Sequence, residues 1–170
     1  MKAVAVIALV AATPAFGVDV HFCWIGNEGY RMTGRMTYPD HLADAERITG
    51  EDVTAFEITG YRDASIIGTW SLAERGPDTA WNLNFLPREM RFATGGLSYG
   101  PDGQDWNAGG GVDACGVPGF GFNSGSAAQD ICLDGIYAIE SGIPPDTPLP
   151  VRPVDTPLEC GGELQLSEVR

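Results

Sequence analysis

Apolar and polar residues alternate over much of the first half of the chain, and this period of two predicts half-buried β-strands. The clearest alternation covers residues 18–25 and 30–38. The segment Gly26-Asn27-Glu28-Gly29 between them is a turn signal, so the two runs predict a hairpin. The pattern continues in shorter pieces. Further strands are expected at residues 53–62, 66–72, 81–85, 91–93, 97–99, 131–139 and 164–169.

Helical signals are few. Asp40 can cap a short helix that runs through Arg47 and ends at Gly50, because its carboxylate can accept hydrogen bonds from the free N–H groups of a first turn. Strand-like runs recur at a spacing of roughly 8–12 residues, and no long amphipathic helices alternate with them. The sequence therefore predicts a mainly β fold, namely a single-domain antiparallel β-sandwich or barrel with a Gly-rich irregular region and at most one short helix.

Two regions depart from the strand pattern. Residues 94–126 are rich in glycine and include Gly109-Gly110-Gly111, so a long loop is expected there, either functional or mobile. Residues 143–157 contain six of the twelve prolines and are expected to be extended and poor in hydrogen bonds, as a surface tail or a linker. The expected organisation is a β domain at 18–142, a Pro-rich extended segment at 143–159 and a C-terminal strand or tail at 160–170.

The N-terminus has the three parts of a secretory signal peptide. Lys2 precedes a short apolar run at residues 3–12, and small residues occupy the third and first positions before a cut after Gly17. The competing interpretation is a buried N-terminal strand or helix. The apolar run is too short to span a bilayer, which takes about 20 residues. We expect residues 1–17 to be a signal peptide and the remaining chain to be periplasmic or secreted, without membrane insertion.

The chain has four cysteines, and an even number in an oxidising compartment predicts two disulfides. Three pairings are possible. The favoured one joins Cys115 to Cys132, which closes a Gly-rich loop, and Cys23 to Cys160, which fixes the C-terminal tail to the first strand. Zinc would require a closely spaced pair such as C-x-x-C, which the sequence lacks. Neither a metal site nor a cofactor is expected.

Charge excludes several classes of function. The formal net charge is −13, and a strongly acidic surface repels nucleic acid and anionic lipid. Lys2 is the only lysine, so a processed chain would contain no P-loop lysine, no Schiff-base lysine and no Ser-Lys dyad. No G-x-G-x-x-G motif follows a strand, so nucleotide binding has no support.

Two motifs suggest catalysis, and each has a simpler interpretation. Residues 96–100 fit the G-x-S-x-G nucleophile elbow, but both histidines precede Ser98 and a turn replaces the helix that the elbow needs. His21 shares a strand face with Asp19, an arrangement that suits metal binding or acid–base work. A histidine exposed on the polar side of a strand is the commoner case. We therefore assign no catalytic residue.

Calcium binding is a further possibility that the spacing does not favour. Asp102 and Asp105, with Asp113 nearby, could supply oxygen ligands for the ion. They lack the spacing of a calcium-binding loop, and Pro101-Asp102-Gly103 is also a plain β-turn signal. The turn is the favoured interpretation.

Three aromatic residues lie near or within the Gly-rich region, namely Trp81, Tyr99 and Trp106. Exposed Trp and Tyr side chains on a β-sheet can stack on sugar rings or on peptide side chains, whereas the competing interpretation is packing in the core. Trp106 is the strongest candidate for a ligand-binding role because its neighbours are polar or small.

Residues 29–40, in which Gly29 and Tyr30 are followed by Thr37, Tyr38 and Asp40, resemble a segment of exported bacterial proteins of the PEP-CTERM kind. In those proteins a Gly, an aromatic or apolar residue, a Thr and a Tyr precede an Asp at the end of an early strand. The strand at 53–58 is similar to the one that usually follows. The resemblance covers roughly a third of the chain and implies a small secreted β domain without an assigned activity. The chain lacks the Pro-Glu-Pro signal, the hydrophobic anchor and the basic tail, so the resemblance supplies no site residues.

The leading hypothesis is an exported, non-enzymatic binding or envelope-associated protein that holds an unknown protein, small molecule or glycan through the loops at 94–126. One alternative is a small secreted hydrolase that acts on carbohydrate with two carboxylates as acid and base. The other is a structural component of a surface or matrix.

Overall fold

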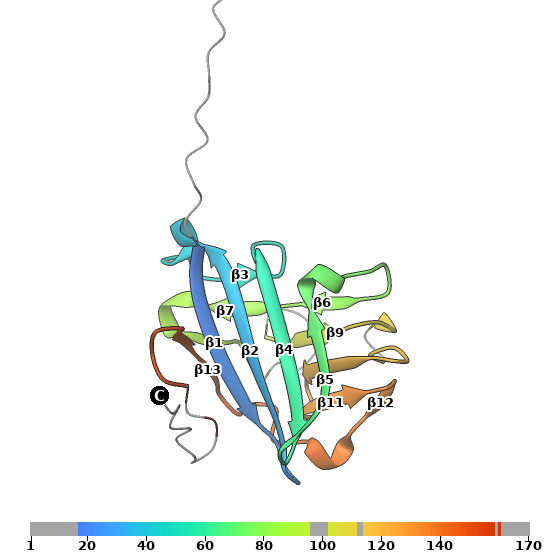
Figure 1. Cartoon of the computed structure of the whole chain (residues 1–170). Coiled ribbons are helices and arrows are strands. Elements are labelled where there is room, and N and C mark those ends of the chain that lie inside the picture. Colours follow the sequence, from blue (N-terminus) through green and yellow to red (C-terminus); the bar gives the residue numbers. More distant parts are fainter. Residues whose placement is uncertain (1–16, 96–101, 112–113, 159, 161–170) are drawn as a thin grey trace, which may run out of the picture.

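The computed structural model describes residues 17–95, 102–111, 114–158 and 160. In this part of the chain the strands form two antiparallel sheets packed against each other, which confirms the predicted mainly β fold (Figure 1). The large sheet has the order β3-β7-β8-β13-β1-β2-β4-β5, and the small sheet has the order β12-β11-β10-β9-β6. The strands are β1 (Gly17–Ile25), β2 (Tyr30–Pro39), β3 (Ile48–Thr49), β4 (Ala55–Arg62), β5 (Ser65–Ser71), β6 (Ala80–Asn82), β7 (Asn84–Leu86), β8 (Arg91–Phe92), β9 (Gln104–Asn107), β10 (Phe120–Ser124), β11 (Gln129–Leu133), β12 (Ile136–Tyr137) and β13 (Leu149–Pro153).

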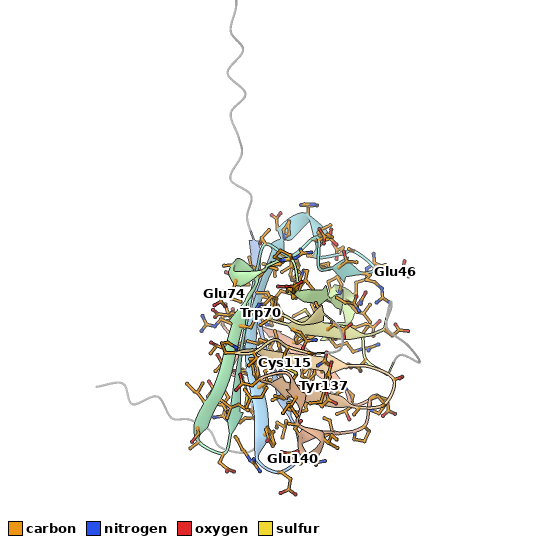
Figure 2. All side chains as sticks on the ribbon, turned by 90° about the vertical axis from the view of Figure 1, so that its right-hand side faces the viewer. Glu46, Trp70, Glu74, Cys115, Tyr137 and Glu140 are labelled. Atoms are coloured by element: carbon orange, nitrogen blue, oxygen red, sulfur yellow. A yellow bond between two sulfur atoms is a disulfide. The ribbon has the colours of Figure 1, made fainter. Side chains whose placement is uncertain are left out.

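The strands of the small sheet run across β1, β2 and β4 rather than along them (Figure 1). Side chains from both sheets fill the space between the layers, as the rotated view in Figure 2 shows. The predicted strands at 97–99 and 164–169 and the predicted signal peptide, apart from Gly17, lie outside the described residues.

Helices in the described part of the chain are single 3-10 turns, and none is long enough to cross a membrane. They are η1 (Asp40–Leu42), η2 (Leu72–Glu74), η3 (Pro87–Glu89) and η5 (Ile139–Ser141). The predicted helix through Arg47 is wrong. The Asp40 side chain makes no capping hydrogen bond, and the chain soon enters β3, where Ile48 is fully buried opposite Phe85. Burial of Ile48 in the sheet therefore outweighs the local capping signal.

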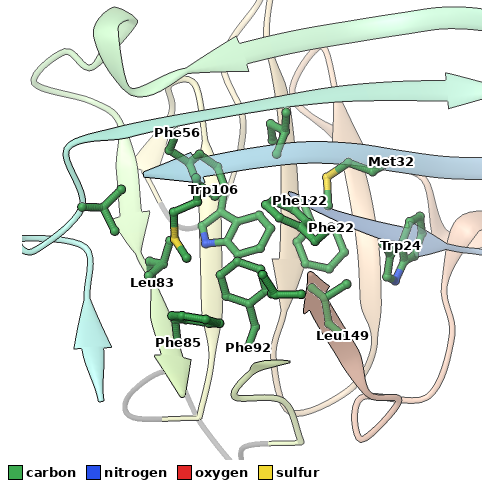
Figure 3. Packing of buried hydrophobic residues seen from close by; sticks show 14 of the residues in the cluster. Phe22, Trp24, Met32, Phe56, Leu83, Phe85, Phe92, Trp106, Phe122 and Leu149 are labelled. Atoms are coloured by element: carbon green, nitrogen blue, oxygen red, sulfur yellow. The ribbon is translucent and has the colours of Figure 1, made fainter. Parts of the chain in front are cut away.

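Trp106 lies at the centre of the core between the sheets (Figure 3). Its ring centroid is 4.9 Å from those of Phe56 and Phe92, 5.0 Å from that of Phe122 and 5.5 Å from that of Phe22. Edge-to-face and tilted pairs at these distances are the favourable geometries for aromatic rings. The rings come from both sheets, so this cluster holds the two layers together.

Two single strands predicted from the sequence are each divided in the structure. The run at 81–85 changes sheets at Leu83, so β6 belongs to the small sheet and β7 to the large one. The run at 131–139 forms the hairpin of β11 and β12, with the turn at Asp134 and Gly135. Asp134 and Gly135 have φ values of 48° and 78°, a left-handed turn that Asp and Gly tolerate best.

The expectation of a continuous loop at 94–126 is wrong. This region contains β9 and β10, which occupy the middle of the small sheet with every residue buried. The sequence looks like a loop because its strands carry buried amides. Asn107 Nδ2 donates to Asn123 Oδ1 at 2.8 Å, and Asn123 Nδ2 donates back to Asn107 Oδ1 at 3.3 Å. Gly121 leaves room for this pair, since a Cβ there would lie 2.0 Å from Asn107 Oδ1.

Part of the Pro-rich segment is a strand rather than a hydrogen-bond-poor tail. β13 lies between β8 and β1 in the large sheet, and Leu149 and Val151 point into the core. Upstream of β13, Gln129 Nε2 donates to the carbonyl oxygens of Pro145 and Thr147. Residues 143–153 therefore pack as part of the β domain.

Both predicted disulfides are present. Cys23 is bonded to Cys160 with a Cα–Cα distance of 5.7 Å, and Cys115 to Cys132 with a Cα–Cα distance of 5.8 Å. The first holds the C-terminal segment against the outer face of the large sheet. The second holds the loop after β9 against β11. Two disulfides fit an oxidising, non-cytoplasmic compartment.

Candidate functional site

A row of polar and charged side chains crosses the outer face of the large sheet. The core faces of β1 and β2 carry the even-numbered residues, so the odd-numbered ones point away from the core. The strand register places His21 opposite Arg35, Arg35 opposite Glu57, and Glu57 opposite Ser71. On its other side His21 lies opposite Arg152 of β13. Neighbouring strands are about 4.8 Å apart, so these side chains are close neighbours across the sheet.

Hydroxyl groups flank this row on both sides. In one flanking row Thr33, Thr59 and Thr69 follow one another across β2, β4 and β5, next to the disulfide-bonded Cys23 of β1. In the other row Asp19 lies opposite Thr37 and accepts a hydrogen bond from its hydroxyl at 2.6 Å. The outer face of β2 thus alternates threonine with arginine, which suits binding of a ligand with many hydroxyl groups.

The face is hollowed at this row, and we call the two adjoining hollows the outer groove. The larger hollow has a volume of about 600 Å³ and the smaller one about 250 Å³, and both are lined by Arg35 and Glu57. The larger hollow also includes Asp19, Thr37, Thr54, Ala55, Ser71 and Val154, and the smaller one His21, Thr33, Thr59 and Leu158. The volume of the larger hollow lies within the range of small-molecule sites in proteins.

The C-terminal segment forms one wall of the outer groove. Val154 N–H donates to Asp19 O at 3.3 Å, and Leu158 lines the smaller hollow two residues before Cys160. The disulfide between Cys160 and Cys23 fastens this wall to β1. The bond therefore has a role in shaping the groove as well as in closing the chain.

Of the aromatic residues predicted to bind ligand, the two that the structure describes do not form an exposed cluster. Trp106 is fully buried in the core, so its predicted role as a solvent-facing stacking platform is wrong. Trp81 is half-buried, donates its Nε1–H to Gly50 O at 2.9 Å and packs on Phe56 at 4.9 Å between ring centroids. Tyr99 lies outside the described residues, as does the G-x-S-x-G motif.

The acidic residues considered for calcium binding do not converge in the described part of the chain. Asp102 forms an ion pair with Arg47 at 3.4 Å, whereas Asp105 lies on β9 in the small sheet. The described residues contain no group of three or more His, Cys, Asp or Glu side chains that could hold a metal ion. Asp113 lies outside those residues.

A second polar row lies on the outer face of the small sheet. Asn82 lies opposite Asp105, Asp105 opposite Asn123, and Asn123 opposite Asp130. In the described part of the chain the Oδ1 atoms of both aspartates are buried and have no hydrogen-bond partner. Desolvation by burial raises the pKa of Asp105 and that of Asp130 to about 6, while the hydrogen bond from Asn82 partly offsets the rise at Asp105. These are the two largest carboxyl pKa shifts in the described residues.

The buried aspartate row is a weaker ligand site than the outer groove, despite its raised pKa values. Asp105 is only 1% exposed, so a ligand cannot reach its carboxyl group in this conformation. Cys115, which is labelled in Figure 2, is joined by a disulfide to Cys132 of β11 in the same sheet. The outer groove, in contrast, is open, and two of its basic groups, the Arg35 guanidinium and His21 Nε2, have no partner among the described residues.

Sequence reasoning did not single out Arg35 and Glu57. Both stand at polar positions of strands that the alternation predicts, and the turn at 26–29 is enough to place His21 near Arg35 within the first hairpin. The position of Glu57 next to Arg35 depends on the pairing of β2 with β4, and the pairing of His21 with Arg152 depends on β13. Alternation within one strand carries no information about such partners.

Comparisons with protein-family models, with curated proteins and with solved structures found no match for this chain. What the outer groove binds must therefore follow from its own side chains.

Proposed function

We propose that this chain is an exported binding protein, periplasmic or secreted, that holds a small polyhydroxylated ligand such as a saccharide in the outer groove. The observation that carries the proposal is an open hollow of about 600 Å³ lined by hydroxyl, carboxylate and guanidinium groups. Sugar hydroxyls both donate and accept hydrogen bonds. The Thr37 hydroxyl already donates to Asp19 and the Ser71 hydroxyl to Glu74, so both can accept from a ligand, as Asp19 can, and Arg35 can donate.

The position of these side chains on paired strands favours binding. Each of the side chains that line the two hollows from β1, β2 and β4 projects from a long paired strand, and binding groups on such elements lose little freedom when a ligand arrives. The predicted site in the loops at 94–126 has less support, because the described core of that region is two buried strands.

A carbohydrate-acting hydrolase is the second candidate. The observation in its favour is that two carboxylates, Asp19 and Glu57, line the larger hollow. Paired carboxylates are the usual acid and base of glycoside hydrolysis. Release of reducing ends from the bound saccharide, abolished by Glu57→Gln, would decide for the hydrolase over the binding protein.

Occlusion of the outer groove tests the proposed function directly. Ala55 is exposed in the larger hollow, so Ala55→Trp should fill it and abolish saccharide binding in a glycan array and in calorimetry. Ala64→Trp is the matched control, because Ala64 is also exposed but lies outside the groove, in the turn after β4. Equal binding by both variants, or no saccharide bound by the unaltered protein, would refute the proposal.

A further inference from the structure

Almost every arginine that the structure describes has a partner. The pairs are Arg47 with Asp102, Arg75 with Glu51, Arg91 with Glu89, Arg88 with the carbonyl of Asp44, Arg31 over the ring of Tyr61 and Arg62 over the ring of Tyr30. Among the described arginines, only Arg35 and Arg152 have a side chain that makes no ion pair, hydrogen bond or ring contact in that part of the chain.

These two arginines lie on either side of one histidine. His21 of β1 is opposite Arg35 on β2 and opposite Arg152 on β13. The Nε2 atom of His21 is buried and has no hydrogen-bond partner within the described residues. In the part of the chain that the structure describes, the side chains of Arg35 and Arg152 and the Nε2 atom of His21 thus form one row of basic groups without partners, and Arg35 and His21 line the outer groove.

A shortage of carboxylates does not explain the missing partners. The chain has 23 Asp and Glu residues against 10 Lys and Arg. Glu57 even lies directly opposite Arg35 on β4, but the two side chains form no ion pair within 4.0 Å in the described structure. The guanidinium of Arg35 therefore keeps its five N–H donors available to the groove.

We propose that the outer groove selects saccharides that carry an oxyanion, a carboxylate or a sulfate ester, and that Arg35 binds this oxyanion with His21 and Arg152 beside it. The planar guanidinium matches carboxylate and sulfate oxygens with two parallel hydrogen bonds. Arg35 lines both hollows, so an oxyanion bound there leaves space for sugar rings on either side. This inference rests on the proposed saccharide-binding function and specifies its ligand.

The same geometry predicts an opposing effect from Glu57. Its carboxylate shares both hollows with Arg35 and repels a bound oxyanion, so removal of its charge should strengthen binding of an acidic saccharide. A neutral saccharide should lack this gain. The sign of the Glu57 effect thus separates charge recognition from general packing.

Calorimetric titration at low salt tests the inference on residues 18–170 with both disulfides intact. The matched probes are cellotriose and its C6-oxidised triuronate. The triuronate should bind at least tenfold more tightly than cellotriose. Arg35→Gln should remove that advantage and Glu57→Gln should increase it severalfold. Arg75→Gln, which removes the same charge at an exposed ion pair outside the groove, should change neither affinity. Sodium sulfate and O-sulfated cellotriose separate the carboxylate source from the sulfate source.

The outcomes distinguish the two proposals. Equal binding of neutral and acidic saccharides, both abolished by Ala55→Trp, would refute the oxyanion inference and leave the proposed function standing. Binding of inorganic sulfate as tightly as any saccharide would refute recognition of the sugar. Failure of every saccharide to bind would overturn both.

Discussion

The side chain of Gln104 makes hydrogen bonds to backbone groups next to Leu83, where the chain passes from one sheet to the other. Its side chain is fully buried, its Oε1 accepts from Asn84 N–H at 3.0 Å, and its Nε2 donates to Asn84 O at 2.9 Å and to Ala93 O at 2.8 Å. This one amide accepts from Asn84 N–H and donates to two carbonyl oxygens, and the carbonyl oxygen of Asn84 also accepts from Ala93 N–H at 2.9 Å. A buried polar residue inside the core is tolerated here because all of its hydrogen bonds are made.

Gln104→Leu should therefore lower the free energy of unfolding by about 3 kcal/mol, because three hydrogen bonds to backbone groups are lost at about 1 kcal/mol each. Urea unfolding followed by tryptophan fluorescence measures the change. Gln104→Glu keeps the acceptor for Asn84 N–H but faces two carbonyl oxygens, so it should also be destabilising, and increasingly so as pH rises. A loss below about 0.5 kcal/mol for Gln104→Leu would show that water or backbone movement satisfies these groups.

Residues of this kind mark the limit of what the sequence predicts. The first hairpin is predictable because Val20, Phe22 and Trp24 alternate with polar residues around a clear turn. β9 is not predictable, because Gln104, Asp105 and Asn107 look like loop residues and are buried only through partners on β7, β6 and β10. The outer groove has the same limitation, since its row of side chains is defined by strand register.

At the scale of elements, a pair of glycines lets the two sheets approach. Gly60 of β4 lies opposite Gly68 of β5, and the ring of Phe120 from β10 rests on both. A Cβ at Gly60 would lie 2.3 Å from the Phe120 ring, and a Cβ at Gly68 would lie 2.6 Å from it. The pair thus forms a depression in the large sheet that receives a side chain of the small one.

Gly60→Ala should destabilise the protein by about 1–3 kcal/mol, the usual cost of overpacking a core. Thermal unfolding of Gly60→Ala, Phe120→Leu and the double variant measures the coupling, and the double variant should be more stable than the sum of the single effects predicts. Gly76→Ala is the control, because a Cβ at Gly76 meets nothing within 4 Å. Additive effects would mean that Gly60 is not needed for the fit of Phe120.

For the whole molecule, the buried aspartates make stability depend on pH in an unusual direction. Burial raises the pKa of Asp105 and of Asp130 from 3.8 to about 6. The unfolded chain therefore releases these protons at lower pH than the folded chain does. The stabilising effect of the protonated, buried carboxyls is complete below about pH 4 and is lost as pH rises toward 6. Ionisation of these groups thus opposes folding at neutral pH, in addition to the self-repulsion of a chain with net charge −13.

Asp105→Asn should raise the free energy of unfolding at pH 7.5 by about 3 kcal/mol, because the pKa is raised by about two units and each unit costs about 1.4 kcal/mol. The same change should have little effect at pH 4. Chemical unfolding across pH 4–8 measures the difference between the variant and the unaltered protein. Asp78→Asn, which removes the same charge at an exposed position, corrects for the change in net charge. After that correction only Asp105→Asn should flatten the profile between pH 4 and pH 6. If Asp105→Asn were equally destabilising at both pH values, the carboxylate would have a stabilising partner in solution, and the raised pKa of Asp105 would be refuted.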